Sequence, residues 1–282
     1  MKNIVITGAS TGIGYTTSKA LIKKGYRVFG SVRKKSDADK LSKEFGKNFH
    51  PLIFDVTDAD GVTSAAKKTG EIIGEQGLSA LINNAGIAVG GPLMHMPLED
   101  FRWQIEVNVL GLLSSSQAFL PLLGAKKNCG HRPGRILNIS SVAGKVSNPF
   151  MGAYCASKHA VEAISDTMRI ELQLYGIDVI TIGPGVVKTP IWNKAEDFDL
   201  SKYENTDYKQ SGYIIQKFMQ KLSKNGFEQE IFGKMMVKII ETKKPKTRYP
   251  LVYQKFRNWT LLRMIPRRTL DKIIGKKLGL IK

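Results

Sequence analysis

A tyrosine and a lysine lie four residues apart in the segment YCASK, residues 154 to 158, just before the apolar-periodic run HAVEAISDTMRIEL. Four residues make about one helical turn, so Tyr154 and Lys158 would be neighbours near the start of one helix. A free tyrosine titrates near ~10, and a fixed ammonium beside the phenol favours the phenolate and lowers its pKa. The spacing therefore predicts an acid/base pair. The alternative is a tyrosine at a packing boundary beside a solvated lysine.

A glycine-rich segment, TGASTGIG at residues 7 to 14, follows an apolar β-like run at the start of the chain. An amphipathic helical pattern comes directly after it. Gly8, Gly12 and Gly14 would let the backbone turn sharply and approach a pyrophosphate, which the unpaired N–H groups and the dipole of a helix N-terminus attract. This context predicts a dinucleotide site.

Strand-like and helical segments alternate along the chain. KNIVITGAS, TTSKALIKKGY and YRVFGSV give strand, helix and strand, and the same alternation continues through LIFDV, SAAKKTGEIIGE and LSALINNAG, and then through GRILNISS, residues 156–175 and IDVITIGPG. Apolar strands separated by helices favour a parallel sheet covered on both faces. With 282 residues and 42% hydrophobic side chains, we expect one domain over residues 1–282. The predicted fold class is α/β, a Rossmann-type doubly wound sheet in three α/β/α layers.

Six motifs in order resemble the short-chain dehydrogenase/reductase family over about residues 1–190. They are TGASTGIG, NNAG at 83–86, Asn108 in EVNVLG, ISS at 139–141, YCASK, and PGVVKT at 184–189. The segment PGVVKTPIW and a long basic tail more loosely resemble the branch of retinol and 17β-hydroxysteroid dehydrogenases. The resemblance implies an NAD(P)-dependent oxidoreductase that interconverts an alcohol and its carbonyl.

The resemblance also implies the catalytic residues. Tyr154 matches the acid/base, and Lys158 matches the residue that lowers its pKa and holds the nicotinamide ribose. Ser141 matches the serine that hydrogen-bonds the substrate oxygen, and Asn108 matches a helix residue whose kinked backbone supports a water near the lysine. Individually, Ser141 could close a strand and Asn108 could face a neighbouring helix.

Cofactor choice is expected to depend on the end of the second strand, where Val32 is followed by Arg33, Lys34 and Lys35. A guanidinium can pair with a 2′-phosphate, which an acid would repel, so Arg33 favours NADP(H) over NAD(H). The alternative is a solvated charge, and Thr11 replaces a basic residue that some NADP-binding members carry. The residues that match cofactor contacts of the family are Gly8, Ser10, Thr11, Gly12, Ile13, Gly14, Arg33, Asp55, Val56, Asn84, Ala85, Gly86, Tyr154, Lys158, Pro184, Gly185, Val187 and Thr189, with Asp55 and Val56 at the adenine.

Beyond residue 190 the chain changes character. Residues 191–240 are polar and amphipathic, and we expect them to form a helical lid over the substrate site.

Residues 243–282 form a basic tail with thirteen Lys or Arg against one acidic residue, so a net charge of +12 out of the total of +19 lies there. Leu270, Ile273, Ile274, Leu278 and Ile281 fall at helical spacing, and Phe256, Trp259, Leu262 and Ile265 form a second stripe. A basic amphipathic tail of this kind predicts binding to an anionic membrane surface, with packing on the lid or on a second subunit as the alternative.

The remaining features narrow the class of protein. MKNIVITG enters a strand at once and resembles no signal peptide, and no apolar run approaches the ~18 residues of a membrane span. Cys129 and Cys155 lie in unlike contexts and predict no disulfide, and His131 beside Cys129 does not make a metal site. Nothing resembling a nucleic-acid-binding motif accompanies the positive charge.

We therefore expect a cytoplasmic enzyme, peripheral on a membrane through its tail. Its substrate would be a small lipophilic alcohol or carbonyl compound, retinoid-, steroid- or lipid-like. The resemblance implies a homodimer or homotetramer. Two other functions fit the same fold: a 3-oxoacyl-(acyl carrier protein) reductase-like enzyme, and a non-catalytic dinucleotide sensor or scaffold. The intact set of Asn108, Ser141, Tyr154 and Lys158 argues against the latter.

Overall fold

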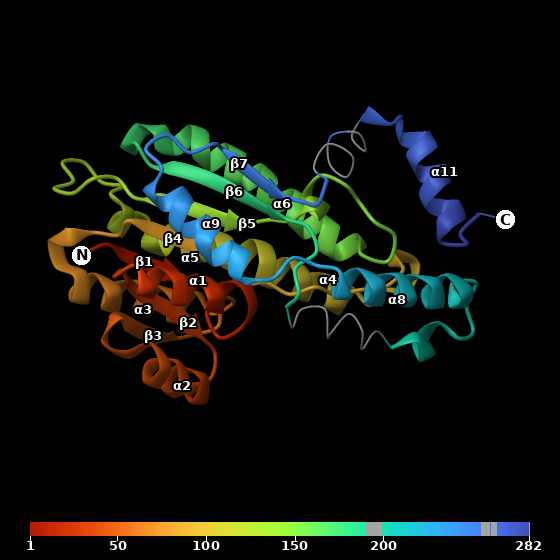
Figure 1. Cartoon of the computed structure of the whole chain (residues 1–282), viewed down its shortest axis with the longest axis horizontal. Coiled ribbons are helices and arrows are strands. Elements are labelled where there is room, and N and C mark those ends of the chain that lie inside the picture. Colours follow the sequence, from red (N-terminus) through yellow and green to blue (C-terminus); the bar gives the residue numbers. More distant parts are fainter. Residues whose placement is uncertain (190–198, 255–259, 261–263, 282) are drawn as a thin grey trace.

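The structure, a computed structural model, describes residues 1–189, 199–254, 260 and 264–281. Seven strands form one sheet in the order β3-β2-β1-β4-β5-β6-β7, and every neighbouring pair is parallel (Figure 1). The strands are β1 (Asn3–Ile6), β2 (Arg27–Val32), β3 (Phe49–Ile53), β4 (Ala80–Asn83), β5 (Arg135–Ile139), β6 (Asp178–Pro184) and β7 (Arg248–Leu251). The predicted doubly wound parallel sheet is confirmed.

Helices cover both faces of the sheet because successive strand residues point to opposite sides. In β1, Ile4 and Ile6 belong to one core cluster, whereas Val5 belongs to the other. The first cluster lies under α1 (Gly12–Lys23), α2 (Lys35–Phe45) and α9 (Glu230–Glu241), and the second under α3 (Ala59–Ile73), α5 (Gly111–Phe119) and α6 (Gly152–Glu171). The chain thus has the three expected layers.

Short helical turns connect these elements. They are η1 (Gly46–Asn48), η2 (Gly74–Gln76), η3 (Leu93–His95), η5 (Leu120–Leu123), η6 (Val142–Gly144), η7 (Leu172–Tyr175) and η8 (Leu200–Tyr203), and a π-helical turn, η4 (Glu106–Leu110), joins α4 (Leu98–Ile105) to α5. The continuous helical run Leu98–Leu123 is long and apolar enough to cross a membrane. This is weak evidence for a membrane span, because 44% of its apolar window is buried inside the molecule, as in the core helix of a soluble protein.

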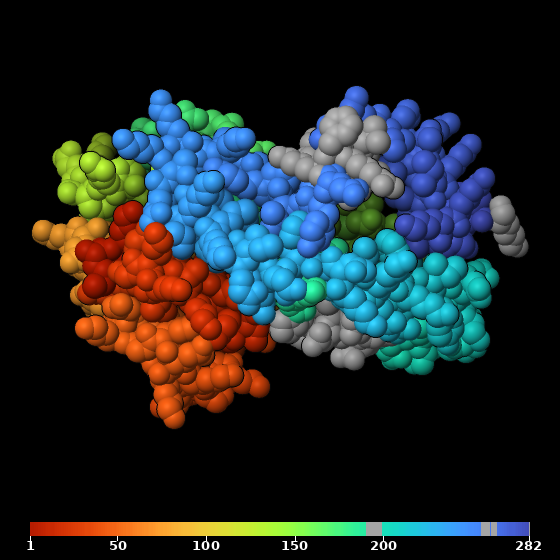
Figure 2. Space-filling view, in the orientation of Figure 1, coloured from red at the N-terminus to blue at the C-terminus, as the bar shows by residue number. Residues whose placement is uncertain are grey.

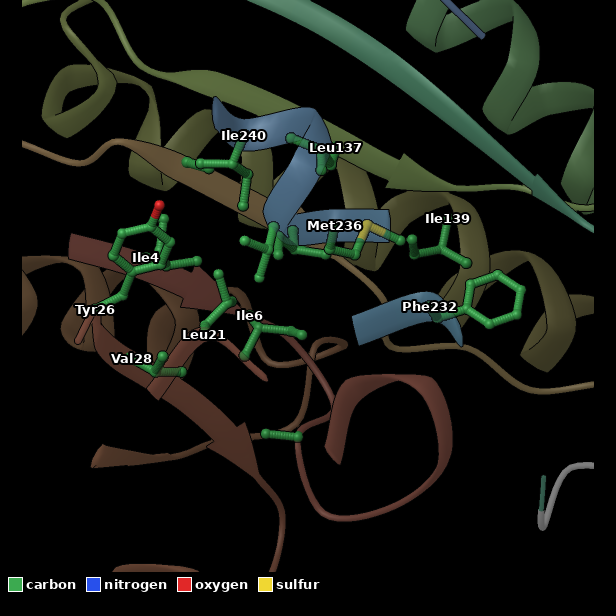
Figure 3. Close-up of a cluster of buried hydrophobic side chains, with 14 of the residues drawn as sticks. Ile4, Ile6, Leu21, Tyr26, Val28, Leu137, Ile139, Phe232, Met236 and Ile240 are labelled. Carbon is green, nitrogen blue, oxygen red and sulfur yellow. The ribbon is translucent and has the colours of Figure 1, made fainter. Parts of the chain in front are cut away.

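Helix α9 belongs to the core, although the sequence placed it in the lid. Phe232 and Met236 are fully buried, and with Ile239 and Ile240 they form an apolar face that packs beside α1 and above β1 and β5 (Figure 3). These four side chains recur at i, i+4, i+7 and i+8, the spacing of one helix face. The part of the predicted lid that remains is η8 and α8 (Lys209–Lys224).

Strand β7 is a second difference, because the sequence placed residues 243–282 in a separate tail. Arg248 pairs with Thr181, and Leu251 pairs with Pro184, so this segment extends the sheet beside β6. The strand is short and contains Pro250, which has no N–H to donate and is tolerated at a sheet edge. Such a segment lacks the periodic pattern that identifies longer strands.

The C-terminal helix α11 (Arg267–Lys277) lies against α8 at one end of the molecule (Figure 2). Leu278 joins Phe150 and Ile215 in a small buried cluster, and the Ser211 hydroxyl donates a hydrogen bond of 3.3 Å to the carbonyl of Gly279. Of the predicted apolar stripe, Ile274 and Leu278 therefore pack with residues of α8, Leu270 is buried, and Ile273 and Ile281 are exposed. Of the second stripe, Ile265 is half-buried, and Phe256, Trp259 and Leu262 lie outside the described residues.

Candidate active site

The loop between β1 and α1 has a backbone that only glycine fits at several positions. Gly8 and Gly12 have φ angles of 70° and 60°, in the left-handed region. At Gly14, a Cβ atom would lie 2.1 Å from the carbonyl oxygen of Gly8 and 2.6 Å from Nδ2 of Asn84. The loop is therefore folded back tightly on itself at the N-terminus of α1, where unpaired backbone N–H groups can meet an anion.

Polar side chains from neighbouring strands brace this loop. Asn84, which follows β4, donates from Nδ2 to the carbonyls of Thr7 and Gly8, both at 2.9 Å. The Thr7 hydroxyl accepts hydrogen bonds from the backbone N–H groups of Asn84 and Ala85, and the Ser31 hydroxyl accepts one from Gly8. Asn84, predicted as a cofactor contact, thus supports the loop through its side chain. The bracing by Thr7 and Ser31 was not predicted.

The predicted adenine end of the site lies where β2 and β3 finish. Nη1 of Arg33 is 3.9 Å from a carboxylate oxygen of Asp55, and the Arg33 side chain is 65% exposed. Asp55 also accepts hydrogen bonds from the backbone and the hydroxyl of Thr57. Val56 is buried, and a Cβ at Gly111 would lie 2.8 Å from it. The structure therefore brings Arg33, Asp55 and Val56 to one edge of the sheet, with the guanidinium accessible.

Tyr154 and Lys158 lie one turn apart in the first half of α6, as predicted. Nζ of Lys158 is 5.7 Å from the centre of the Tyr154 ring and donates a hydrogen bond of 2.8 Å to the carbonyl oxygen of Ile139, the last residue of β5. Lys158 is only 6% exposed. The amine is therefore fixed between the catalytic helix and the end of a strand.

Burial dominates the titration of both groups. Burial raises the pKa of the Tyr154 phenol, and hydrogen bonding with Ser141 opposes that rise. Burial lowers the pKa of Lys158 to about 8, and the charge of Glu162 opposes the fall. The expected lowering of the Tyr154 pKa is not found here, because the phenol is desolvated and the ammonium is directed at the carbonyl of Ile139. A protonated phenol is the form that can donate a proton to a carbonyl oxygen.

Ser141 joins the ends of β5 and β6. Its hydroxyl accepts a hydrogen bond of 3.1 Å from the backbone N–H of Ala143 at the start of η6, and donates one of 3.4 Å to the carbonyl of Pro184. The backbone N–H of Gly185 donates to Leu251 in β7. Val187 is buried in the core, so its side chain serves packing, and Thr189 is half-buried.

Asn108 lies in the π-helical turn η4, which is the kinked backbone that the sequence predicted. Its Nδ2 donates to the carbonyl of Ile87 and to the Ser157 hydroxyl, both at 3.0 Å, and its Oδ1 accepts from the N–H of Ile87 at 2.8 Å. Gln104, buried one turn earlier, makes similar bonds to Ile87 and Val89 and was not predicted. Together these side chains tie the segment after β4 to α6.

Gly86 lies close to both Asn108 and Lys158. A Cβ atom there would lie 3.2 Å from Oδ1 of Asn108 and 3.7 Å from Nζ of Lys158. Gly14 lies beyond β1 and Gly86 beyond β4, at the carboxyl ends of the two strands between which the strand order reverses. Doubly wound sheets bind dinucleotides at such a switch point.

A comparison with protein-family models decides the family. The model described as "short chain dehydrogenase" matches residues 2–199. The chain belongs to the short-chain dehydrogenase family. It is an NAD(P)-dependent oxidoreductase that acts on a CH–OH group or the corresponding carbonyl.

Several short-chain dehydrogenases are similar to this chain over most of its length. "NADPH-dependent 3-dehydrocapnine reductase" of Ornithobacterium rhinotracheale is 41% identical over 278 residues, covering 99% of this chain and 98% of the relative. "3-ketodihydrosphingosine reductase" of Bacteroides thetaiotaomicron is 34% identical over 263 residues, 91% and 92% of the two chains. Retinol dehydrogenase 16 of Mus musculus is 35% identical over 195 residues, 69% of this chain and 59% of that protein. The solved structure "ElxO with NADP Bound" is 25% identical, with a TM-score of 0.70 over 89% of this chain and 96% of the other.

Replacing Tyr154 by Phe keeps the ring and removes only the exchangeable proton. We expect kcat to fall by about a hundredfold to ten-thousandfold, the usual contribution of a positioned acid or base, with little change in cofactor affinity. Steady-state kinetics and fluorescence titration with NADPH measure the two quantities. Tyr175→Phe makes the same change just past the far end of α6 and should leave kcat near the parent value. Substantial turnover by Tyr154→Phe would disprove the role of the phenol.

Proposed function

We propose that this short-chain dehydrogenase uses NADPH to reduce the 3-oxo group of a long-chain, sphingoid-type lipid. The observation that carries the proposal is similarity along almost the whole chain to two relatives whose names describe reductases of a 3-dehydro and a 3-keto lipid. The similarity to the first relative extends through the predicted lid and the tail. A lipophilic carbonyl substrate is thus favoured over other substrates of the family.

In this proposal, the substrate carbonyl oxygen lies between Ser141 and Tyr154. The Ser141 hydroxyl holds that oxygen, and the Tyr154 phenol donates the proton that completes the alcohol. Lys158 holds the nicotinamide ribose and keeps a positive charge near the phenol, which favours loss of its proton in the transition state. When bound, the nicotinamide cofactor supplies the hydride that reduces the carbonyl carbon.

Two observations fit reduction with NADPH. Burial raises the pKa of Tyr154, which favours the protonated phenol, the form that can donate a proton to a carbonyl oxygen. The accessible guanidinium of Arg33 at the end of β2 can pair with a 2′-phosphate, and no acidic residue occupies that position. The Arg33–Asp55 distance of 3.9 Å is long for a hydrogen-bonded pair, so Arg33 can turn toward a phosphate.

The surroundings of the catalytic helix suit an apolar chain. Phe150 lies four residues before Tyr154, has a φ angle of 62°, and packs with Ile215 of α8 and Leu278 beyond α11. Its ring meets that of Tyr208 edge to face, with the ring centres 5.8 Å apart. Residues of α8 and of the C-terminal segment therefore pack as a buried apolar cluster beside the start of α6, and we propose that a lipid chain binds on this side of the catalytic helix.

The proposal predicts both the substrate and the cofactor. Purified protein with NADPH should reduce 3-dehydrocapnine or 3-ketodihydrosphingosine with a higher kcat/KM than retinal or a steroid ketone, as measured by NADPH oxidation and mass spectrometry of the alcohol.

Arg33→Asp should weaken the affinity for NADPH relative to that for NADH roughly ten- to a hundredfold, because one charge-assisted contact of about 1.5 to 3 kcal/mol is lost. Lys40→Asp, the same charge change on exposed α2, is the matched control. Equal use of NADPH and NADH by the parent, or preference for retinal, would refute the proposal.

We further propose that the protein is cytoplasmic and peripheral on an anionic membrane, where a lipid substrate is concentrated. Exposed Lys272 and Lys276 lie on α11, and each lysine near such a surface contributes about 1 kcal/mol. Sedimentation with anionic vesicles should therefore carry the parent protein down at low salt and less at high salt. The double variant Lys272→Glu/Lys276→Glu should bind at least tenfold more weakly, whereas Lys234→Glu/Lys238→Glu on α9 should not. Equal weakening by both pairs would show a general charge effect instead of a membrane-binding tail.

A homodimer or homotetramer is also part of the proposal. Trp103 and Leu110, on the helical run from α4 to α5, are 42% and 47% exposed, and a second copy of the chain would cover them. Light scattering after gel filtration measures the mass directly. A monomer at micromolar concentration would remove this part of the proposal without affecting the rest.

A further inference from the structure

A buried carboxylate lies one helical turn beyond Lys158. Glu162 is only 4% exposed, and its two carboxylate oxygens accept hydrogen bonds from Nε and Nη2 of Arg248, at 3.0 and 2.6 Å. Nζ of Lys145, just after η6, is 3.4 Å from the same carboxylate. A charge from each of three elements, α6, β7 and the loop after β5, therefore meets beside the active site.

The backbone around this ion pair leaves room for it. A Cβ atom at Gly183 would lie 2.8 Å from Nη2 of Arg248, so the guanidinium passes directly over β6 at a glycine. A Cβ at Gly144 would lie 2.9 Å from Cγ of Glu162. Neither glycine has a φ angle that demands glycine. Close approach of the guanidinium explains Gly183, whereas at Gly144 a Cβ would also lie 2.7 Å from the Ser140 hydroxyl and 2.8 Å from the carbonyl oxygen of Lys158.

Arg248 also contacts the backbone of the residue that would hold the substrate oxygen. Its Nη2 donates a hydrogen bond of 3.3 Å to the carbonyl of Ser141. Ser141 is thus held by Arg248 on its carbonyl side and by Pro184 and Ala143 on its hydroxyl side. A displacement of Arg248 would be transmitted to Ser141 through one hydrogen bond.

The Glu162 carboxyl stays ionised in this setting. Burial alone would raise its pKa, but the hydrogen bonds and charge of Arg248, together with the charge of Lys145, hold the pKa below its usual value. The charged groups that face Glu162 are therefore Arg248 from β7, Lys145 from the loop after η6, and Lys158 from its own helix. Burial lowers the pKa of Lys158 to about 8.

A buried ion pair is weak evidence for stability, because desolvation of two charges offsets much of their attraction. The position of the Glu162–Arg248 pair beside Ser141 and Lys158 instead indicates a role in the active site. We propose that Glu162, held by Arg248, is a positioning residue: it fixes the backbone of Ser141 through Arg248 and places a negative charge that keeps Lys158 protonated. The inference depends on the role of Lys158 in holding the cofactor and not on which ketone is reduced.

The test is the pH dependence of NADPH affinity, measured by fluorescence titration without any substrate. In the parent protein, affinity should fall as Lys158 loses its proton, with a midpoint near the Lys158 pKa of about 8. Glu162→Gln removes the negative charge and should move the midpoint down by about one pH unit, as expected for charges one helical turn apart. Lys145→Met removes a positive charge from the same cluster and should move the midpoint up.

Opposite shifts distinguish this role from a purely structural one. Loss of packing would lower affinity or stability in both variants without moving the midpoint, and unchanged midpoints or shifts of the same sign would overturn the proposal. If Glu162→Gln fails to fold, Lys145→Met carries the test alone, because its side chain is 30% exposed and its removal leaves Arg248 on the carboxylate. Failure to reduce a 3-oxo lipid would leave these binding results unaffected, so the two proposals fail separately.

Discussion

The burial of one ammonium group is the constraint on which the active site depends. Lys158 is almost fully buried, and the structure gives its Nζ a single short hydrogen bond among the described residues, to the last carbonyl of β5. A buried amine loses its proton easily unless a negative charge is near, and burial brings its pKa down to about 8. The hydrogen bond to Ile139 holds the amine in place, and the charge of Glu162 opposes the fall of its pKa.

The sheet supplies the positions from which these groups meet. Parallel strands end at a common edge, so Gly8, Asn84, Ser141 and Pro184 come together although they lie far apart in the sequence. The strand order reverses between β1 and β4, where doubly wound sheets bind dinucleotides, and hydrogen bonds through the side chains of Thr7 and Asn84 brace the loop there. On another side of the molecule, residues of α8 and α11 pack together with Phe150.

The fold and most of the site could be predicted because they depend on local patterns. Alternating apolar segments indicated the sheet, and the spacing of Tyr154 and Lys158 indicated their contact. Strand β7 and helix α9 could not be placed, since Arg248 had no periodic neighbours and the apolar face of α9 does not say which surface it will cover. In the sequence, Glu162 is one acidic residue within a helical run, so its ion pair with Arg248 could not be predicted. The direction of the Tyr154 pKa also required the structure, because desolvation depends on every surrounding element.

The most direct test of this account is the pH dependence of folding stability in the parent protein and in Lys158→Met. The pKa of Lys158 is about 8 in the folded protein and near 10.5 when unfolded, so between these values the unfolded chain binds more protons. The free energy of unfolding of the parent should therefore rise relative to Lys158→Met by about 2 kcal/mol between pH 7 and pH 10, as measured by denaturant titration at each pH. A constant difference between the two proteins over that range would show that the lysine is not desolvated, and would contradict the account.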